Sequence, residues 1–306
     1  MSAKINQENL NIFYGFACNY SCDGCTSGSD AVDRAQDPDL DAIFKVIPRL
    51  SEMFAVSNMI TLIGGEPLLY WEDRVEPLAI MLRQHFPQVK INIFTNGQLL
   101  GKKLEKVIDL MIALGNVDIT ITRHVSHLAA TQVVTKWHES IDSVGQHPLI
   151  VKLHDDHWHI INHVHNNLHF VNTDSAYWKS FYQHTSDGTI KPWATNDPVG
   201  SMIHGCTGSV CSVIVENRLY KCGPLAMLAD NLKSRGQIDD PAWAKYINYP
   251  WIDVWNPRAD LLQQFVDTYG RPTEYCDMCA NKPHQQTRWQ SRTYQMVFQK
   301  QFVSHD

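Results

Sequence analysis

Asn11-Ile-Phe-Tyr-Gly-Phe16, followed by Ala17 and then Cys18-Asn-Tyr-Ser-Cys22-Asp-Gly-Cys25, is the stretch that decides the fold. The first six residues predict a strand, and the cysteines follow it with the spacing C-x₃-C-x₂-C. Iron–sulfur clusters are normally held by four thiolates, so three thiolates in one loop leave one iron without a protein ligand. A metal centre needs such an open position to bind a substrate. The spacing leaves one alternative open, a structural zinc knuckle whose fourth ligand lies elsewhere.

The composition indicates a globular protein with neither a secretion signal nor a membrane span. The 306 residues are 44% hydrophobic and carry a formal net charge of −6. This acidic balance argues against a broad phosphate-binding surface, so we do not expect a nucleic-acid partner. The N-terminus lacks an apolar segment, and no stretch approaches about 18 uninterrupted apolar residues, so we expect a cytoplasmic protein with no membrane contact. Its eight cysteines are then expected to be reduced thiols or metal ligands.

The first half of the chain alternates predicted strands and helices, as the hydrophobic spacing indicates. After the first strand we expect a helix over 40–54, a strand at Met59–Ile63, a helix over about 73–86, a strand at Val89–Phe94, a helix over 102–114 and a strand at Val117–Thr122. This alternation predicts a parallel sheet with crossover helices, which is the α/β class.

The second half is less periodic. A helix near 129–142, a strand at Leu149–His154, a helix near 156–166 and a strand at Leu168–Val171 would complete six β/α units. We therefore predict that residues 1–185 form a partial (β/α)6 TIM-like barrel. The segment 185–205 is rich in Gly, Pro, Asp and Thr and indicates a linker. Beyond it we expect a second domain, built as a hairpin plus helices over 186–290, and a C-terminal tail over 291–306. The predicted hairpin pairs 210–215 with 218–221 around Glu216 and Asn217.

Three motifs occur in a fixed order: C-x₃-C-x₂-C after the first predicted strand, Gly64-Gly65-Glu66-Pro67 after the second, and Thr95-Asn96-Gly97 after the third. This order resembles the radical S-adenosylmethionine (SAM) superfamily over about residues 8–125. The resemblance implies that Cys18, Cys22 and Cys25 hold a [4Fe–4S] cluster whose open iron is chelated by the methionyl amine and carboxylate of SAM. It further implies that a flavodoxin- or ferredoxin-type donor reduces the cluster, and that SAM is then cleaved to a 5′-deoxyadenosyl radical.

The same resemblance implies a set of SAM contacts. Gly64, Gly65 and Glu66 would meet the methionyl amine, and a glycine pair suits a close backbone approach. The family usually has an aromatic residue before the third cysteine, where this chain has Gly24, so Tyr20 or a C-terminal aromatic residue would pack on the adenine. The other implied contacts, at the ends of the third and fourth strands, are with the ribose or the methionyl carboxylate: Thr95, Asn96, Thr122 and Arg123.

Five further cysteines lie in the second half of the chain. The pattern of Cys206, Cys222, Cys276 and Cys279 resembles the twitch and SPASM extensions of radical SAM enzymes, with Asn217 where a glycine is usual. Four such ligands would fill a second, auxiliary [4Fe–4S] cluster, and Cys211 would then be spare. A zinc ribbon is the alternative. In the histidine-rich stretch, His159 and His163 would lie one turn apart on the expected 156–166 helix, as metal ligands or as ordinary partner-bonded histidines.

The residues and the resemblance together predict an enzyme that uses a carbon radical to remove a hydrogen atom from a small-molecule, nucleotide or peptide substrate. An auxiliary cluster would suit removal of a second electron, giving a net oxidation. Two alternatives stay open: a radical rearrangement of a nucleoside-like substrate, and a non-catalytic zinc or iron–sulfur scaffold protein.

Overall fold

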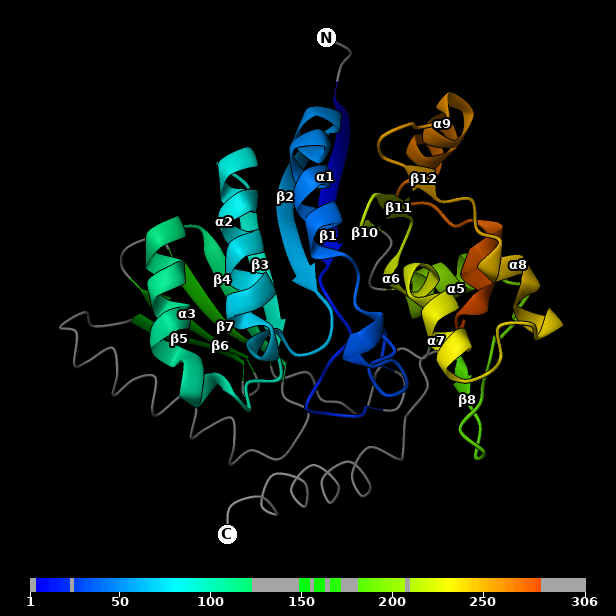
Figure 1. The fold of residues 1–306 in the computed structure, drawn as a ribbon, viewed down its shortest axis with the longest axis horizontal. Helices are drawn as coiled ribbons and strands as arrows, with labels where there is room; N and C mark the ends of the chain where they lie inside the picture. Colours follow the sequence, from blue (N-terminus) through cyan, green and yellow to red (C-terminus); the bar gives the residue numbers. More distant parts are fainter. Residues whose placement is uncertain are drawn as a thin grey trace.

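A ten-stranded sheet forms the centre of this computed structural model, which describes residues 4–22, 25–122, 149–154, 157–162, 166–171, 181–206 and 210–281 (Figure 1). The strand order is β12-β11-β10-β1-β2-β3-β4-β7-β6-β5, and within the described residues no pairing closes the two edges into a barrel. The strands are β1 (Ile5–Phe13), β2 (Phe54–Ile63), β3 (Lys90–Thr95), β4 (Val117–Thr122), β5 (Leu149–His154), β6 (His157–Asn162), β7 (Asn166–Val171), β10 (Cys211–Val215), β11 (Arg218–Tyr220) and β12 (Ile252–Asp253); β8 (Gln183–His184) and β9 (Ile190–Lys191) pair separately.

Three crossover helices, α1, α2 and α3, cover one face of the sheet between its parallel strands (Figure 1). In α1, Asp39 caps the first turn by accepting a hydrogen bond from the backbone of Asp41. The helices are α1 (Leu40–Met53), α2 (Glu76–His85), α3 (Leu100–Leu114), α5 (Pro198–Gly205), α6 (Gly223–Ala226), α7 (Leu228–Ser234), α8 (Ala244–Ile247) and α9 (Ala259–Thr268); shorter turns are η1 (Arg34–Gln36), η2 (Pro67–Leu69), η3 (Trp71–Val75), η5 (Pro241–Trp243) and η6 (Glu274–Met278).

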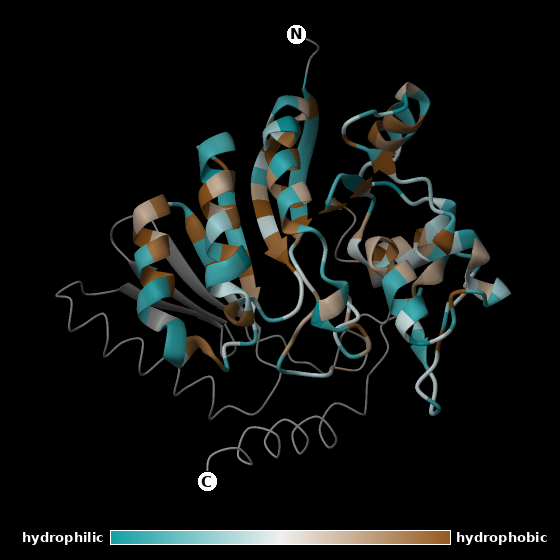
Figure 2. Ribbon diagram, viewed as in Figure 1, coloured by the Kyte–Doolittle hydropathy of each residue, from teal (hydrophilic) through white to brown (hydrophobic). Residues whose placement is uncertain are grey.

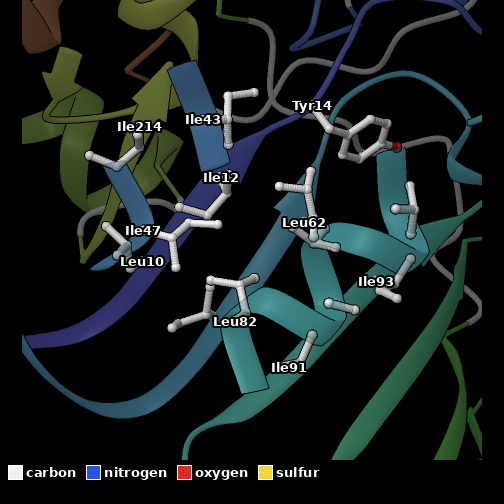
Figure 3. Close-up of a cluster of buried hydrophobic side chains, with 14 of the residues drawn as sticks. Leu10, Ile12, Tyr14, Ile43, Ile47, Leu62, Leu82, Ile91, Ile93 and Ile214 are labelled. Atoms are coloured by element: carbon white, nitrogen blue, oxygen red, sulfur yellow. The ribbon is translucent and has the colours of Figure 1, made fainter. Parts of the chain in front are cut away.

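The main core lies between these helices and the sheet. Every second residue of a strand faces the helices, and there the side chains are apolar and fully buried, as at Leu10 and Ile12 of β1. Ile43 and Ile47, one helical turn apart on α1, pack on the same cluster (Figure 3). The outer surfaces of α1 and α2 carry hydrophilic residues (Figure 2). This one-sided burial confirms the predicted α/β class, with β1 to β4 parallel.

The predicted helix over 156–166 is wrong. That region forms β6 and the beginning of β7, and the chain runs β5-β6-β7 as an antiparallel meander whose last strand pairs in parallel with β4. The sequence His157-Trp-His-Ile-Ile161 is short and rich in aromatic and β-branched residues, a composition that favours a strand. Because 157–162 is extended, the helical spacing of His159 and His163 does not apply. The predicted strand at Leu149–His154 is confirmed, whereas the predicted helix near 129–142 and the tail over 291–306 lie outside the described residues.

The C-terminal region extends the same sheet. Strand β10 pairs in parallel with β1, and β11 returns antiparallel to it, which confirms the predicted hairpin. The positive φ angle at its turn is at Glu216 (55°) and not at Asn217, the residue that stands where a glycine is usual. The segment predicted to be a linker contains α5. The boundary between the two predicted domains stays a prediction. In the described part of the chain, no helix is long and apolar enough to cross a membrane.

Arg83 of α2 binds the two loops that lead into the amino ends of β3 and β4. Its guanidinium donates to five backbone carbonyls, those of Phe86, Pro87, Val89, Gly115 and Asn116. Replacing Arg83 with methionine removes the donor from five carbonyls, three of them in part-buried hydrogen bonds, so we expect a loss of about 2 kcal/mol in the free energy of unfolding. Urea denaturation measures this loss. Arg49→Met, which removes only an exposed pair with Glu52, should cost less than about 0.5 kcal/mol, and equal effects of the two variants would contradict the assignment.

Candidate functional site

The cysteine loop leaves the carboxyl end of β1, where open α/β sheets place their ligand sites. Two side chains form hydrogen bonds with the backbone at the start of this loop. Asp37 Oδ1 accepts a hydrogen bond from the Phe16 amide at 2.6 Å, and the Tyr70 hydroxyl accepts one from the Ala17 amide at 2.7 Å. Tyr70 also donates to Asp37 at 2.9 Å. The backbone leading into Cys18 is therefore fixed by groups that follow much later in the sequence.

The three N-terminal cysteines are partly buried, and none of them is in a disulfide. The Cys25 amide donates to the Cys22 carbonyl at 3.1 Å, which closes a turn, and Cys18 Sγ accepts from the Tyr20 amide at 3.4 Å. Burial raises the pKa of the Cys18 thiol to about 12 and also raises the pKa of Cys25, and the two sulfurs interact electrostatically. These thiols are neutral without a metal and would lose protons on binding one. Three soft sulfur ligands in one loop are the kind of donors that hold an iron–sulfur cluster.

Gly64 and Gly65 place the turn after β2 directly against the start of the cysteine loop. The Gly65 amide donates to the Gly15 carbonyl and the Glu66 amide to the Ala17 carbonyl, both at 2.9 Å. A Cβ atom at Gly65 would lie 1.9 Å from the Ala17 carbonyl oxygen. Gly65 is therefore required by the contact between two protein backbones, whereas the sequence alone predicts only the close approach of a ligand.

Glu66 is buried, with 1% of its surface exposed, and it joins the second and third strand ends. Its Oε1 accepts hydrogen bonds from the Thr95 hydroxyl at 2.5 Å and the Leu68 amide at 3.2 Å, and its Oε2 accepts one from the Asn96 amide at 2.9 Å. Burial raises the pKa of Glu66 to about 7, although these hydrogen bonds lower it. A carboxylate has about four acceptor positions, and donors among the described residues fill three of those of Glu66.

Replacing Thr95 with valine tests this carboxylate. The variant removes a buried hydroxyl that donates to the ionised form of Glu66, so we expect a loss of about 2 kcal/mol in unfolding free energy at pH 8. Because the folded-state pKa of Glu66 (about 7) is above its unfolded value, the carboxyl is largely neutral in the folded protein at pH 5, and the loss should be smaller there. Thr95→Ser retains the hydroxyl, so its unfolding free energy should be close to that of the wild type at both pH values. Denaturation at both pH values tests this, and a pH-independent loss would count against it.

Asn96 faces the cysteine loop. Its side-chain amide donates to Asn19 Oδ1 at 2.8 Å and approaches Cys18 Sγ at 4.0 Å, while Asn19 donates to Gln98. The Thr-Asn-Gly motif thus lies beside Cys18 and Glu66, in agreement with the prediction that the three motifs meet at the strand ends. Asn19 and Gln98 were missed, because single amide residues in turns carry no distinctive signal.

Polar side chains occupy the sheet face opposite the helices. Asn11, Thr61, Asn92 and Asp118 stand in one register row across β1 to β4, and all are buried. The Thr120 hydroxyl donates to Asn92 at 2.9 Å. The corresponding interior of a closed β/α barrel is mostly filled by branched apolar residues. A polar row here, beneath the strand ends that carry the cysteines and Glu66, is suited to hydrogen-bonding a polar molecule.

The second cysteine set also converges. Burial raises the pKa of Cys222 to about 12, with a further contribution from Cys206 and Cys276. The pKa of Cys279 is raised well above its ordinary value by burial and by all three of these cysteines. The four sulfurs, which come from the end of α5, the end of the hairpin and η6, are therefore close enough to interact electrostatically. The side chain of Cys211 lies outside the described residues.

The chain next to one cysteine set contacts the chain next to the other. Gly223 follows Cys222 directly and Thr26 follows Cys25 directly, and a Cβ at Gly223 would lie 3.3 Å from Thr26 Cγ2. Around this contact a second apolar cluster joins Phe13 and Phe16 of the N-terminal half to Trp243 and Met278 of the C-terminal half.

Some predicted site residues stay untested. Gly24, Arg123 and the side chain of Thr122 lie outside the described residues. The Tyr20 amide donates to Cys18 Sγ, which does not test the predicted contact of its ring with the adenine. The SAM contacts expected of Gly64, Gly65, Thr95 and Asn96 stay predictions. In the part of the chain that the structure describes, no group of three or more His, Cys, Asp or Glu residues is arranged to hold a single metal ion.

Part of this chain is similar to one family of known proteins. Residues 12–125 match the family model described as Radical SAM superfamily. The sequence has no significant match among curated proteins. Among solved structures, that of BtrN in complex with AdoMet and 2-DOIA is similar, with 15% identity, coverage of 89% of this chain and 92% of that one, and a TM-score of 0.49. That of polyhistidine-tagged anSMEcpe with bound AdoMet has 14% identity, coverage of 75% and 81%, and a TM-score of 0.32.

Proposed function

From the radical SAM match over residues 12–125, we propose that this protein is a radical SAM enzyme. Cys18, Cys22 and Cys25 would hold a [4Fe–4S] cluster with one iron free for SAM. When bound and reduced, this cluster supplies the electron that cleaves SAM to methionine and a 5′-deoxyadenosyl radical. The observation that carries the proposal is the position of three cysteines in one loop, whose start is hydrogen-bonded to the Gly64–Glu66 turn at the carboxyl ends of parallel strands.

The surrounding residues have definable roles in this proposal. Glu66 has an acceptor position that no described residue fills, which suits the ammonium group of methionine. Asn96 and Asn19 hold the Cys18 side of the loop. Thr95 orients Glu66, so it acts on SAM indirectly. Tyr20, Thr122 and Arg123 stay candidates for contacts with the adenine and the carboxylate.

Cys206, Cys222, Cys276 and Cys279 would hold an auxiliary [4Fe–4S] cluster, as in twitch-type extensions. The electrostatic interactions among these four cysteines support a common cluster site. A flavodoxin or ferredoxin would supply one electron for SAM cleavage, and the substrate would give a hydrogen atom to the 5′-deoxyadenosyl group. The substrate would lose a further proton and electron, so the overall reaction would be a two-electron oxidation. The auxiliary cluster, when bound, would supply the acceptor for that electron.

The substrate would be a small molecule, nucleotide or peptide, and the buried polar row under the site favours one with hydrogen-bonding groups. We place the enzyme in the cytoplasm, because reduced cysteines persist there. A rearrangement without net oxidation is the second candidate, and it would regenerate SAM instead of consuming one molecule per turnover.

Metal analysis tests the two-cluster proposal. Anaerobically reconstituted wild-type protein should contain about eight irons and matching sulfide per chain, four per cluster. Cys276→Ala/Cys279→Ala should contain about half of that and still cleave SAM. One or two zinc ions without iron would support the scaffold alternative and overturn the proposal.

A further inference from the structure

Segment 25–30, which begins with the third cysteine, is held by residues from the far end of the chain. The Cys25 carbonyl accepts hydrogen bonds from the Gly28 amide at 3.0 Å and from the Tyr182 hydroxyl at 3.2 Å. At the other end of the segment, Asp30 forms an ion pair with Arg235, and both side chains are about nine-tenths buried.

Asn231 of α7 joins these two anchors. Its side-chain nitrogen donates to the Tyr182 hydroxyl at 2.8 Å, and its side-chain oxygen accepts from Arg235 Nε at 2.8 Å. It also contacts the middle of the segment, because a Cβ at Gly28, where φ is +71°, would lie 3.1 Å from the Asn231 side chain. Asn231 and Tyr182 are almost completely buried.

We propose that Tyr182, Asn231 and Arg235 form a clamp that sets the position of Cys25. The clamp touches the segment at its start, middle and end, so the segment cannot shift without breaking part-buried hydrogen bonds to Tyr182 and Arg235. These are positioning residues, since none of them is a metal ligand. The placement of the third N-terminal cysteine thus depends on residues that follow it by more than 150 positions. The clamp is a feature beyond the proposed function, but the role of Cys25 as a cluster ligand rests on that function.

Alkylation of the cluster-free protein tests the clamp. Iodoacetamide modifies Cys25 when segment 25–30 opens, and mass spectrometry follows Cys25 and Cys18 separately. Tyr182→Phe removes one hydrogen bond to the Cys25 carbonyl and keeps the ring, and Asn231→Leu removes the central member. We expect Cys25 to react several-fold faster in the first variant and at least about tenfold faster in the second, a tenfold change being about 1.4 kcal/mol. The alkylation rate of Cys18 should change less.

Tyr269→Phe is the matched control, because its hydroxyl also donates to a distant backbone carbonyl, that of Val210. This variant should leave the alkylation rate of Cys25 unchanged even if it lowers the thermal stability of the protein. In reconstituted Tyr182→Phe, the electron paramagnetic resonance (EPR) signal of the reduced cluster should also change, which a loss of stability alone would not cause. Equal Cys25 rates in wild type, Tyr182→Phe and Tyr269→Phe would overturn the proposal, whether or not Asn231→Leu folds. The alkylation result stands independently of SAM cleavage, so the clamp and the proposed function fail separately.

Discussion

Replacing Cys25 with alanine should remove about four of eight irons per chain and abolish the effect of SAM on the EPR spectrum of the reduced protein. Two remaining thiolates, Cys18 and Cys22, cannot hold the cluster, and the SAM-binding iron is lost with it. Iron determination and low-temperature EPR with and without SAM measure both effects. The same loss is expected of the Cys18→Ala and Cys22→Ala variants.

Cys211→Ala is the control for this prediction, because the second cysteine set has four other members. It should retain the full iron content and the response to SAM. A Cys25→Ala protein with unchanged iron and an unchanged SAM response would show that Cys25 is not a ligand. Loss of all iron in that variant would instead show that the two sites do not assemble independently.

Gly65→Ala should destabilise the protein by about 3 kcal/mol or more. The added Cβ would lie 1.9 Å from the Ala17 carbonyl oxygen and 2.7 Å from that of Phe16. Both obstacles are backbone atoms leading into Cys18, and they are fixed by Asp37 and Tyr70. The cysteine loop must therefore move, so iron binding at the N-terminal site should fall together with stability. Urea denaturation and iron analysis measure the two effects.

Gly188→Ala provides the comparison. Its φ angle is +86° and no atom lies within 4 Å of an added Cβ, so its cost is limited to the backbone conformation, about 1 kcal/mol. If Gly65→Ala were no more destabilising than Gly188→Ala, the contact between the two turns would not be a rigid one.

Local sequence signals were sufficient for much of the fold. The strand Val117–Thr122 was predicted with the bounds that the structure gives it, because its alternation and its neighbouring helix are local features. The three motifs at the strand ends converge as expected, since parallel strands bring their carboxyl ends to one edge of the sheet. Where a short segment was ambiguous, as at His157–Asn162, periodicity alone did not separate helix from strand.

Long-range pairings were not accessible from the sequence. The parallel pairing of β1 with β10 joins segments about 200 residues apart, and no local pattern specifies that partner. The same holds for the clamp on Cys25, which depends on one tyrosine, one asparagine and one arginine in three unremarkable contexts. Gly65 was recognised as important, but the contact that requires it became visible only in the packing of two turns.

Formation of 5′-deoxyadenosine from SAM by anaerobically reconstituted wild-type protein tests the central claim most directly. With dithionite or reduced flavodoxin, we expect 5′-deoxyadenosine and methionine to form in equal amounts, and neither to form with Cys25→Ala. A fully reconstituted and reduced protein that leaves SAM intact, although it carries both clusters, would contradict the assignment of the N-terminal cysteines to radical SAM chemistry.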